Sequence, residues 1–92
     1  MYRIILSKQY KRAVKKIIKS GNCNIFEIQK VINIIASGGK LDTKYRDHAL
    51  KGNMSQYREC HIQGDLLLIY CLNNNELILL LINIGNHSEL FS

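Results

Sequence analysis

The spacing of the apolar residues changes from a helical period to strand-like runs along this 92-residue chain, and this change limits the folds available to it. Between residues 8 and 35 the apolar side chains recur every three or four positions, as on one face of a helix. After residue 56 they form short unbroken runs that are typical of buried strands. Helices followed by strands predict an α+β domain, and the chain length leaves room for one domain, residues 1–92.

The two expected helices carry signals at their ends. Ser7 is expected to cap a helix over residues 8–19, which Gly21 would end. Asn24 opens the second helix, and Glu27 three residues later predicts a capping box. The run 37–39, Ser-Gly-Gly, is expected to end that second helix.

The strands complete a β-α-α-β-β-β order, in which a helix hairpin packs on a mostly antiparallel four-stranded sheet. Turns are expected at Gln63-Gly64 and at residues 73–75, and residues 40–56 show no clear period and are interpreted as a loop. The last two strands are apolar on both faces, which predicts a cleft or a partner protein on the face that the helices leave open. The expected strands are residues 2–6, 57–62, 66–72 and 76–84.

The charge is distributed unevenly. The net charge is +6, and all but one of the thirteen lysines and arginines lie in residues 1–52. A basic half joined to a mildly acidic half is typical of a protein that binds a polyanion such as nucleic acid. The alternative is an ordinary solvated lysine-rich helix face.

The cysteines and the apolar runs indicate the compartment. Cys23, Cys60 and Cys71 are odd in number and form no CxxC pair, which favours reduced thiols in a cytoplasm. The N-terminal apolar run is too short for a signal peptide, and no run approaches the roughly 18 residues of a membrane span. We therefore expect a cytoplasmic protein that does not associate with a membrane.

Three histidines, His48, His61 and His87, all follow the helices. RNA carries its own nucleophile, the 2′-hydroxyl, so its cleavage needs a base, an acid and positive charge near the phosphate. Histidine suits both proton roles because its ordinary pKa lies near neutral pH. Asp65 follows the expected turn and is placed to reach back toward His61, or it is an ordinary turn residue.

A zinc site is the competing interpretation of the same residues. Three histidines and a carboxylate are suitable zinc ligands, but the spacing of His48, His61 and His87 matches no compact ligand motif. A P-loop, a GxGxxG fingerprint and a GxSxG elbow are also absent from the sequence. We expect neither a metal nor a cofactor.

Three segments together resemble one family, the YafQ-type toxins of the RelE/ParE superfamily. They are residues 45–52 (YRDHALKG), 57–65 (YRECHIQGD) and 84–91 (IGNHSELF). The resemblance implies a RelE-like, microbial-ribonuclease-like fold and a toxin of a type II toxin–antitoxin system. It further implies cleavage of mRNA on the translating ribosome and neutralisation by a cognate antitoxin protein.

The resemblance also assigns candidate residues. Its functional positions match His48, His61, Asp65 and His87, and Phe91 supports the C-terminal part of the site. His87 is the expected general acid, either Asp65 or His48 the base, and His61 a group that stabilises or relays charge. The candidates for contact with RNA or its phosphates are Lys51, Arg58, Glu59 and Phe91.

These candidates keep plainer alternatives. Lys51 and Arg58 either hold phosphate or are solvated surface charges, while Phe91 either stacks on a base or packs as an anchor. Two other functions also stay open: a gyrase-inhibiting toxin of the ParE type, which would not need the histidines, and a basic RNA-binding domain without catalysis. The basic first helix is expected to receive an acidic segment of the antitoxin.

Overall fold

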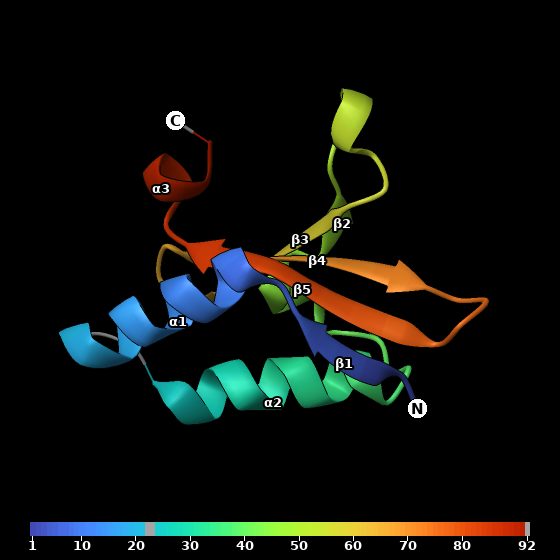
Figure 1. The fold of residues 1–92 in the computed structure, drawn as a ribbon, viewed down its shortest axis with the longest axis horizontal. Helices are drawn as coiled ribbons and strands as arrows, with labels where there is room; N and C mark the ends of the chain where they lie inside the picture. Colours follow the sequence, from blue (N-terminus) through green and yellow to red (C-terminus); the bar gives the residue numbers. More distant parts are fainter. Residues whose placement is uncertain (22–23, 92) are drawn as a thin grey trace.

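The computed structural model describes residues 1–21 and 24–91, so Cys23 lies outside the described residues. Figure 1 shows a sheet with two helices beneath it and, on the other side, a short C-terminal helix and a projecting arm. In chain order the elements are β1 (Arg3–Leu6), α1 (Lys8–Ser20), α2 (Ile25–Ala36), η1 (Thr43–Tyr45), β2 (His48–Ala49), η2 (Gly52–Met54), β3 (Arg58–Gln63), β4 (Leu66–Asn73), β5 (Ile78–Gly85) and α3 (His87–Phe91).

The sheet has five strands in the order β1-β5-β4-β3-β2. β1 runs parallel to β5, whereas the other neighbouring pairs are antiparallel. The predicted α+β class and helix hairpin are confirmed, but the count of four strands is wrong. The fifth strand, β2, contains only two residues and lies inside the segment interpreted as a loop, and α3 was not predicted either.

The helix ends follow the predicted capping residues. The Ser7 Oγ accepts a hydrogen bond from the Tyr10 backbone N–H at 3.0 Å and donates one to the Ile82 carbonyl at 2.6 Å. The first helix ends at Gly21, whose φ of 69° is left-handed and therefore suits glycine. The Asn24 Oδ1 caps α2 by accepting from the Phe26 N–H at 3.0 Å.

One core joins both helices to the sheet. α1 packs chiefly against β5, and α2 packs against β3. The stripe of α2 supplies most of the helical contribution, and the sheet contributes the side chains that point toward the helices. The buried members of this core on the sheet are Cys60, Ile62, Leu68, Tyr70, Leu79, Leu81 and Ile84.

The open face of the sheet is less exposed than its sequence predicted. Leu67 and Ile69 point away from the helical core, yet they are only 3% and 4% exposed in the isolated chain. The chain itself therefore buries these two residues of β4, and the two predicted alternatives for this face, a cleft or a partner protein, stay predictions at this point. Apolar side chains are exposed instead on the edge strand β1 and at Phe26.

The β3–β4 turn consists of Gly64 and Asp65, one residue later than predicted. Gln63 pairs with Leu66, which leaves two residues in the turn. Gly64 has φ of 54°, and hairpins of this length require a positive φ at their first central residue. Asp65 is thus a turn residue on the surface.

No helix in the part of the chain that the structure describes is both long enough and apolar enough to cross a membrane.

Candidate active site

A buried carboxylate lies between two histidines on the open face of the sheet. The Glu59 Oε1 atom is 3.5 Å from the Nε2 atom of His48 and 3.6 Å from the Nε2 atom of His61. The Glu59 side chain is 9% exposed, whereas those of His48 and His61 are 51% and 32% exposed. The carboxylate is therefore withdrawn beneath two imidazoles that solvent can reach.

Strand pairing brings these three residues together. His48 on β2 is the direct cross-strand partner of Glu59 on β3. Glu59 and His61 are two residues apart on the same strand, so their side chains point to the same face. Leu67 and Ile69 of β4 lie beside His61 and Glu59 in the ladder and form an apolar floor.

The hydrogen bond of His48 defines which of its nitrogens is available. The Nδ1 atom is 2.6 Å from the Arg46 carbonyl oxygen. A carbonyl can only accept, so Nδ1 carries a proton and donates it. In the neutral ring, Nε2 is then the unprotonated nitrogen, and it is the atom that faces Glu59.

A second polar cluster lies on the helix-facing side of the same strands. The Asp47 carboxylate accepts hydrogen bonds from the Arg58 guanidinium, the shortest being 2.9 Å from Nη2, and also from the Tyr70 hydroxyl. The hydrogen bond to Asp47 raises the pKa of Arg58. The pKa of Tyr70 is raised mainly by burial and, to a smaller extent, by its hydrogen bond to Asp47. Because Asp47 directly precedes His48, this cluster fixes the start of β2.

Arg58 consequently does not lie with the histidines. Its side chain alternates with that of Glu59 and so points to the opposite face of β3. Its guanidinium is already held by Asp47 in a pair whose side chains are 37% and 24% exposed. In the structure Arg58 therefore forms an ion pair with Asp47, whereas the sequence made it a candidate for contact with phosphate.

His87 and Phe91 lie on α3, at the His61 end of the open face. His61 pairs with Leu67, and Leu67 pairs with Gly85, two residues before His87. This row spans two strand spacings, or about 10 Å. The rings of His87 and Phe91 contact one another, with centroids 5.0 Å apart. Phe91 is therefore a neighbour of His87.

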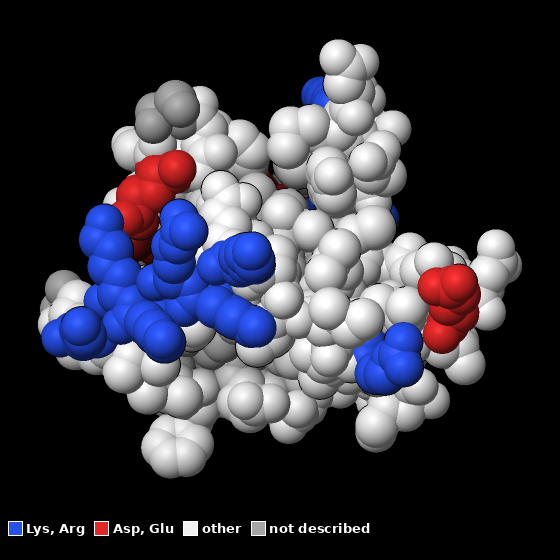
Figure 2. Space-filling model, in the orientation of Figure 1, with Lys and Arg blue, Asp and Glu red and all other residues white. Residues whose placement is uncertain are grey.

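The open face is bordered on two sides. In Figure 1, α3 and the arm that carries β2 and η2 project from the same side of the sheet. Figure 2 shows the surface hollowed between these two projections. Lys51, the residue before η2, is exposed on that arm. The three candidate histidines thus belong to one side of the molecule, the side that α1 and α2 do not cover.

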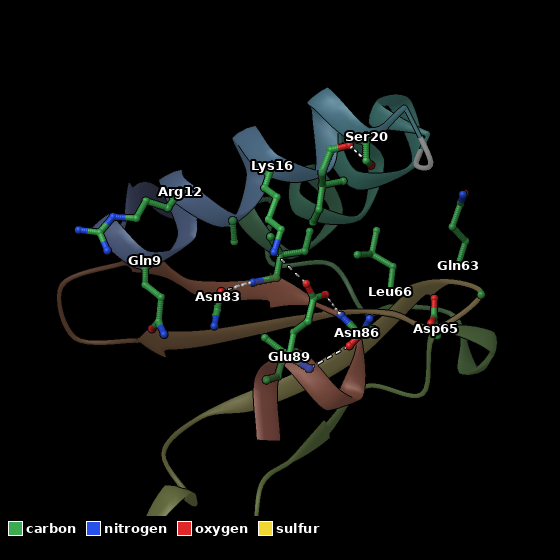
Figure 3. Close-up of a pocket in the computed structure, with 15 residues that line it drawn as sticks. Gln9, Arg12, Lys16, Ser20, Gln63, Asp65, Leu66, Asn83, Asn86 and Glu89 are labelled. Carbon is green, nitrogen blue, oxygen red and sulfur yellow. Dashed lines mark hydrogen bonds and ion pairs between the residues drawn. The ribbon is translucent and has the colours of Figure 1, made fainter. Parts of the chain in front are cut away.

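Asp65 lies apart from the histidine pair. It lines a groove of about 660 Å³ between α1, the β3–β4 turn and α3. Figure 3 shows this groove, with Arg12 and Lys16 of α1 on one side and, on the other, Glu89 of α3 and Asn86, the residue before that helix. Among the described residues, no hydrogen bond or ion pair joins Asp65 to a histidine, although the sequence suggested a contact with His61.

Lysines and arginines crowd along α1. This helix has no acidic residue in its first turn, and Figure 2 shows its basic side chains gathered on one part of the surface. The cluster adjoins the groove through Arg12 and Lys16. Its members are Lys8, Lys11, Arg12, Lys15, Lys16 and Lys19. Six of the twelve lysines and arginines in residues 1–52 therefore lie on this one helix.

The sequence underestimated Glu59. The family resemblance makes it only a candidate contact to RNA, whereas in the structure it lies between His48 and His61. The alternation of Glu59 and His61 was a usable signal, but the approach of His48 depended on the unpredicted strand β2. In the described part of the chain, no three His, Cys, Asp or Glu side chains are arranged to hold a metal ion.

Comparisons with known proteins agree on one family. The sequence profile of the family described as bacterial toxin of type II toxin–antitoxin system, YafQ, matches residues 2–92. A relative from Escherichia coli named mRNA interferase toxin YafQ is 37% identical over 51 residues, which cover 55% of this chain and 53% of the relative.

Solved structures share the fold over almost the whole chain. A metal-bound toxin from Helicobacter pylori is 38% identical, with a TM-score of 0.91 over 99% of this chain and 100% of that one. The toxin chain of the E. coli DinJ–YafQ toxin–antitoxin complex is 27% identical, with a TM-score of 0.85 over 99% and 98% of the two chains.

Proposed function

The chain belongs to the YafQ family of toxins from bacterial type II toxin–antitoxin systems, and we propose that it is an endoribonuclease that cleaves mRNA. The name of the E. coli relative, an mRNA interferase, supports this activity. The observation that carries the proposal is the Glu59 carboxylate between the Nε2 atoms of His48 and His61. Two imidazoles beside a carboxylate supply proton transfer and positive charge at one place.

In the proposed reaction the 2′-hydroxyl of the substrate attacks the adjacent phosphorus in line. A bond forms between the 2′-oxygen and phosphorus, and the bond from phosphorus to the 5′-oxygen breaks. The 2′-hydroxyl proton passes to a base, and an acid donates a proton to the leaving 5′-oxygen. The products are a 2′,3′-cyclic phosphate and a free 5′-hydroxyl, and no step requires a metal.

We assign the base to His48, because its Nδ1 atom donates to the Arg46 carbonyl and Nε2 is then the unprotonated nitrogen of the neutral ring. Glu59 then stabilises the imidazolium that forms. Asp65 is the alternative base, but it lines the groove beside α1 and makes no described contact with the histidines. His61, held by the same carboxylate, stabilises the negative phosphate oxygens.

The C-terminal part of the site completes the reaction in this proposal. His87 is the general acid, and its ring contacts Phe91, which limits the positions that the imidazole can adopt. Phe91 is 38% exposed, which leaves part of its ring free to stack on a base of the RNA. Lys51, exposed on the arm at the other border of the site, is the remaining candidate for a phosphate contact.

The proposed partners are an antitoxin protein and RNA. A cognate antitoxin protein is proposed because the E. coli relative is found in a complex with its antitoxin, DinJ. The basic cluster on α1 is complementary to an acidic segment of such a protein and to the phosphates of mRNA or ribosomal RNA. We place the activity in the cytoplasm, on mRNA that the ribosome is translating.

Primer extension on a reporter mRNA tests this function, with and without translation and with EDTA present. We expect cleavage that persists in EDTA and requires translation, and that falls about 10²-fold or more in His48→Ala and in His87→Ala. Asp65→Asn should retain more activity than His48→Ala if His48 is the base. Loss of cleavage on chelation would overturn the metal-free mechanism, and equal cleavage of naked RNA would overturn the ribosome requirement.

A further inference from the structure

α3 is too short to hold its own conformation. It has five residues, His87–Phe91, and a helix of this length has a nucleation cost that its few internal hydrogen bonds do not offset. The bond from the Leu90 N–H to the Asn86 carbonyl, 3.1 Å long, spans its single turn. His87 is the exposed first residue of this helix, so its position depends on what fixes the start of α3.

Two reciprocal hydrogen bonds fix that start. The Asn86 Oδ1 accepts from the Glu89 backbone N–H at 2.9 Å, and the Glu89 Oε1 accepts from the Asn86 backbone N–H at 2.9 Å. This arrangement is a capping box, which satisfies two backbone donors that a helix start leaves free. His87 lies between the two residues that form the box.

The Glu89 side chain is also packed against the end of β5. A Cβ atom added at Gly85 would lie 3.0 Å from the Glu89 Oε1 and 3.5 Å from the Leu90 Cδ2. The absence of a side chain at position 85 therefore allows the carboxylate to approach the backbone. Figure 3 shows Glu89 between Asn86 and Lys16, whose Nζ is 3.7 Å from the other carboxylate oxygen.

From these contacts we propose that Glu89 is a positioning residue for His87. It sets the start of α3 and thereby the place where the His87 imidazole meets the substrate. The inference rests on the proposed function in one respect, namely that His87 takes part in cleavage. The physical claim, that Glu89 orders the His87 region, stands on its own contacts.

Glu89 positions His87 through its capping hydrogen bonds with Asn86. Its ion pair with Lys16 contributes less to this positioning. The Lys16 side chain is 81% exposed and that of Glu89 is 46% exposed, and an exposed pair of this kind contributes little. Glutamine keeps an acceptor for the Asn86 N–H and occurs naturally in capping boxes, but it removes the charge. Alanine removes both, so the two substitutions separate the cap from the ion pair.

The first experiment measures cleavage of a reporter mRNA in a purified translation system as a function of toxin concentration. Glu89→Ala should lower the plateau rate constant by about tenfold to 10²-fold, because a displacement near 1 Å at a reacting group has effects of this size. The concentration that gives half of the plateau rate should not change. Glu89→Gln should restore the plateau to within about threefold of the wild-type value.

Asn24→Ala is the matched control, because it removes an asparagine cap from α2, away from the site. It should lower the melting temperature to a similar degree as Glu89→Ala and leave the plateau rate unchanged. An equal loss of plateau rate in Asn24→Ala would overturn the proposal, because the effect would then reflect stability alone. Full plateau activity in Glu89→Ala would overturn it as well.

An NMR measurement on the same variants separates this inference from the proposed function. Nuclear Overhauser contacts between the rings of His87 and Phe91 should be present in the wild-type protein, in Glu89→Gln and in Asn24→Ala, and lost in Glu89→Ala. If the wild-type protein cleaves no RNA, the proposed function fails while this readout still tests the positioning role. Retention of the ring contacts in Glu89→Ala would overturn that role.

Discussion

At the scale of single residues, Glu59 is the group on which the candidate site depends. Its carboxylate is buried between two histidines, and one of its oxygen atoms is within 3.6 Å of both Nε2 atoms. A buried carboxylate is costly unless it is paired, so Glu59 and an imidazole stabilise one another when that imidazole is protonated. The role of His48 as base requires this partner when the ring becomes charged.

Substitution Glu59→Gln tests that role with little change in volume. We expect the cleavage rate to fall by at least about tenfold, because the neutral amide stabilises neither imidazolium, while the helices and sheet remain folded. Glu76→Gln is the control, since it removes an exposed carboxylate from the β4–β5 turn. Initial cleavage rates and circular dichroism provide the comparison, and an unimpaired Glu59→Gln enzyme would contradict the assignment.

Cys60 gives the chain a measurable response to high pH. Burial raises the pKa of this fully buried thiol from its ordinary 9.0 to about 12. The folded chain therefore retains the proton more tightly than the unfolded chain, and the free energy of unfolding falls as pH rises from 9 toward 12. The expected slope for Cys60 is about 1.4 kcal/mol per pH unit.

Urea unfolding at several pH values between 9 and 12 measures that slope. Cys60→Ala removes the titrating group, so its free energy of unfolding should decline less steeply than that of the wild-type protein. The slope should not vanish, because burial also raises the pKa values of Tyr10 and Tyr70. Identical slopes for the two proteins would show that Cys60 is not responsible.

At the scale of elements, Ser7 connects the start of α1 to β5. Its hydroxyl both caps the helix and donates to the Ile82 carbonyl, whereas Asn24 provides only a cap. Ser7→Ala should therefore lower the free energy of unfolding by about 2 kcal/mol, and Asn24→Ala by about 1 kcal/mol. Urea titrations of both variants would check this order, which a smaller loss for Ser7→Ala would reverse.

Elements with a repeating pattern were predictable, and elements held by distant contacts were not. The helices were recognised from apolar stripes and from caps such as Ser7 and Asn24. β2 has two residues, too few for a period, and it is fixed by Asp47 through Arg58 and Tyr70. The start of α3 carries an Asn-x-x-Glu signal at Asn86 and Glu89 like that at Asn24 and Glu27, but the helix is too short to show a stripe.

The two Asn-x-x-Glu signals also had different outcomes. Asn86 and Glu89 form the reciprocal box. The Glu27 carboxylate accepts a hydrogen bond from the buried Tyr45 hydroxyl at 3.0 Å, which ties α2 to η1. The motif therefore located a helix start in both cases, while tertiary contacts decided what the glutamate bonds.

At the scale of the whole molecule, the change in the spacing of the apolar residues, from a helical period to strand-like runs, was sufficient to predict the fold class. It was not sufficient to predict how the site is assembled. The sequence and its family resemblance selected the three histidines. Which of them meet depends on strand register, which placed His48 opposite Glu59 and left Asp65 in a turn. The uneven charge is a feature of the sequence itself, and the structure concentrates much of it on α1 (Figure 2).

The chemistry at the ends of the cleaved RNA tests the central claim most directly. Mass spectrometry of the fragments from a reporter mRNA, cleaved in the presence of EDTA, identifies both ends of each cut. Attack by the 2′-hydroxyl predicts a 2′,3′-cyclic phosphate on the upstream fragment and a free 5′-hydroxyl on the downstream fragment. A 3′-hydroxyl with a 5′-phosphate would mean that water is the nucleophile, and would contradict the proposed roles of His48, Glu59 and His87.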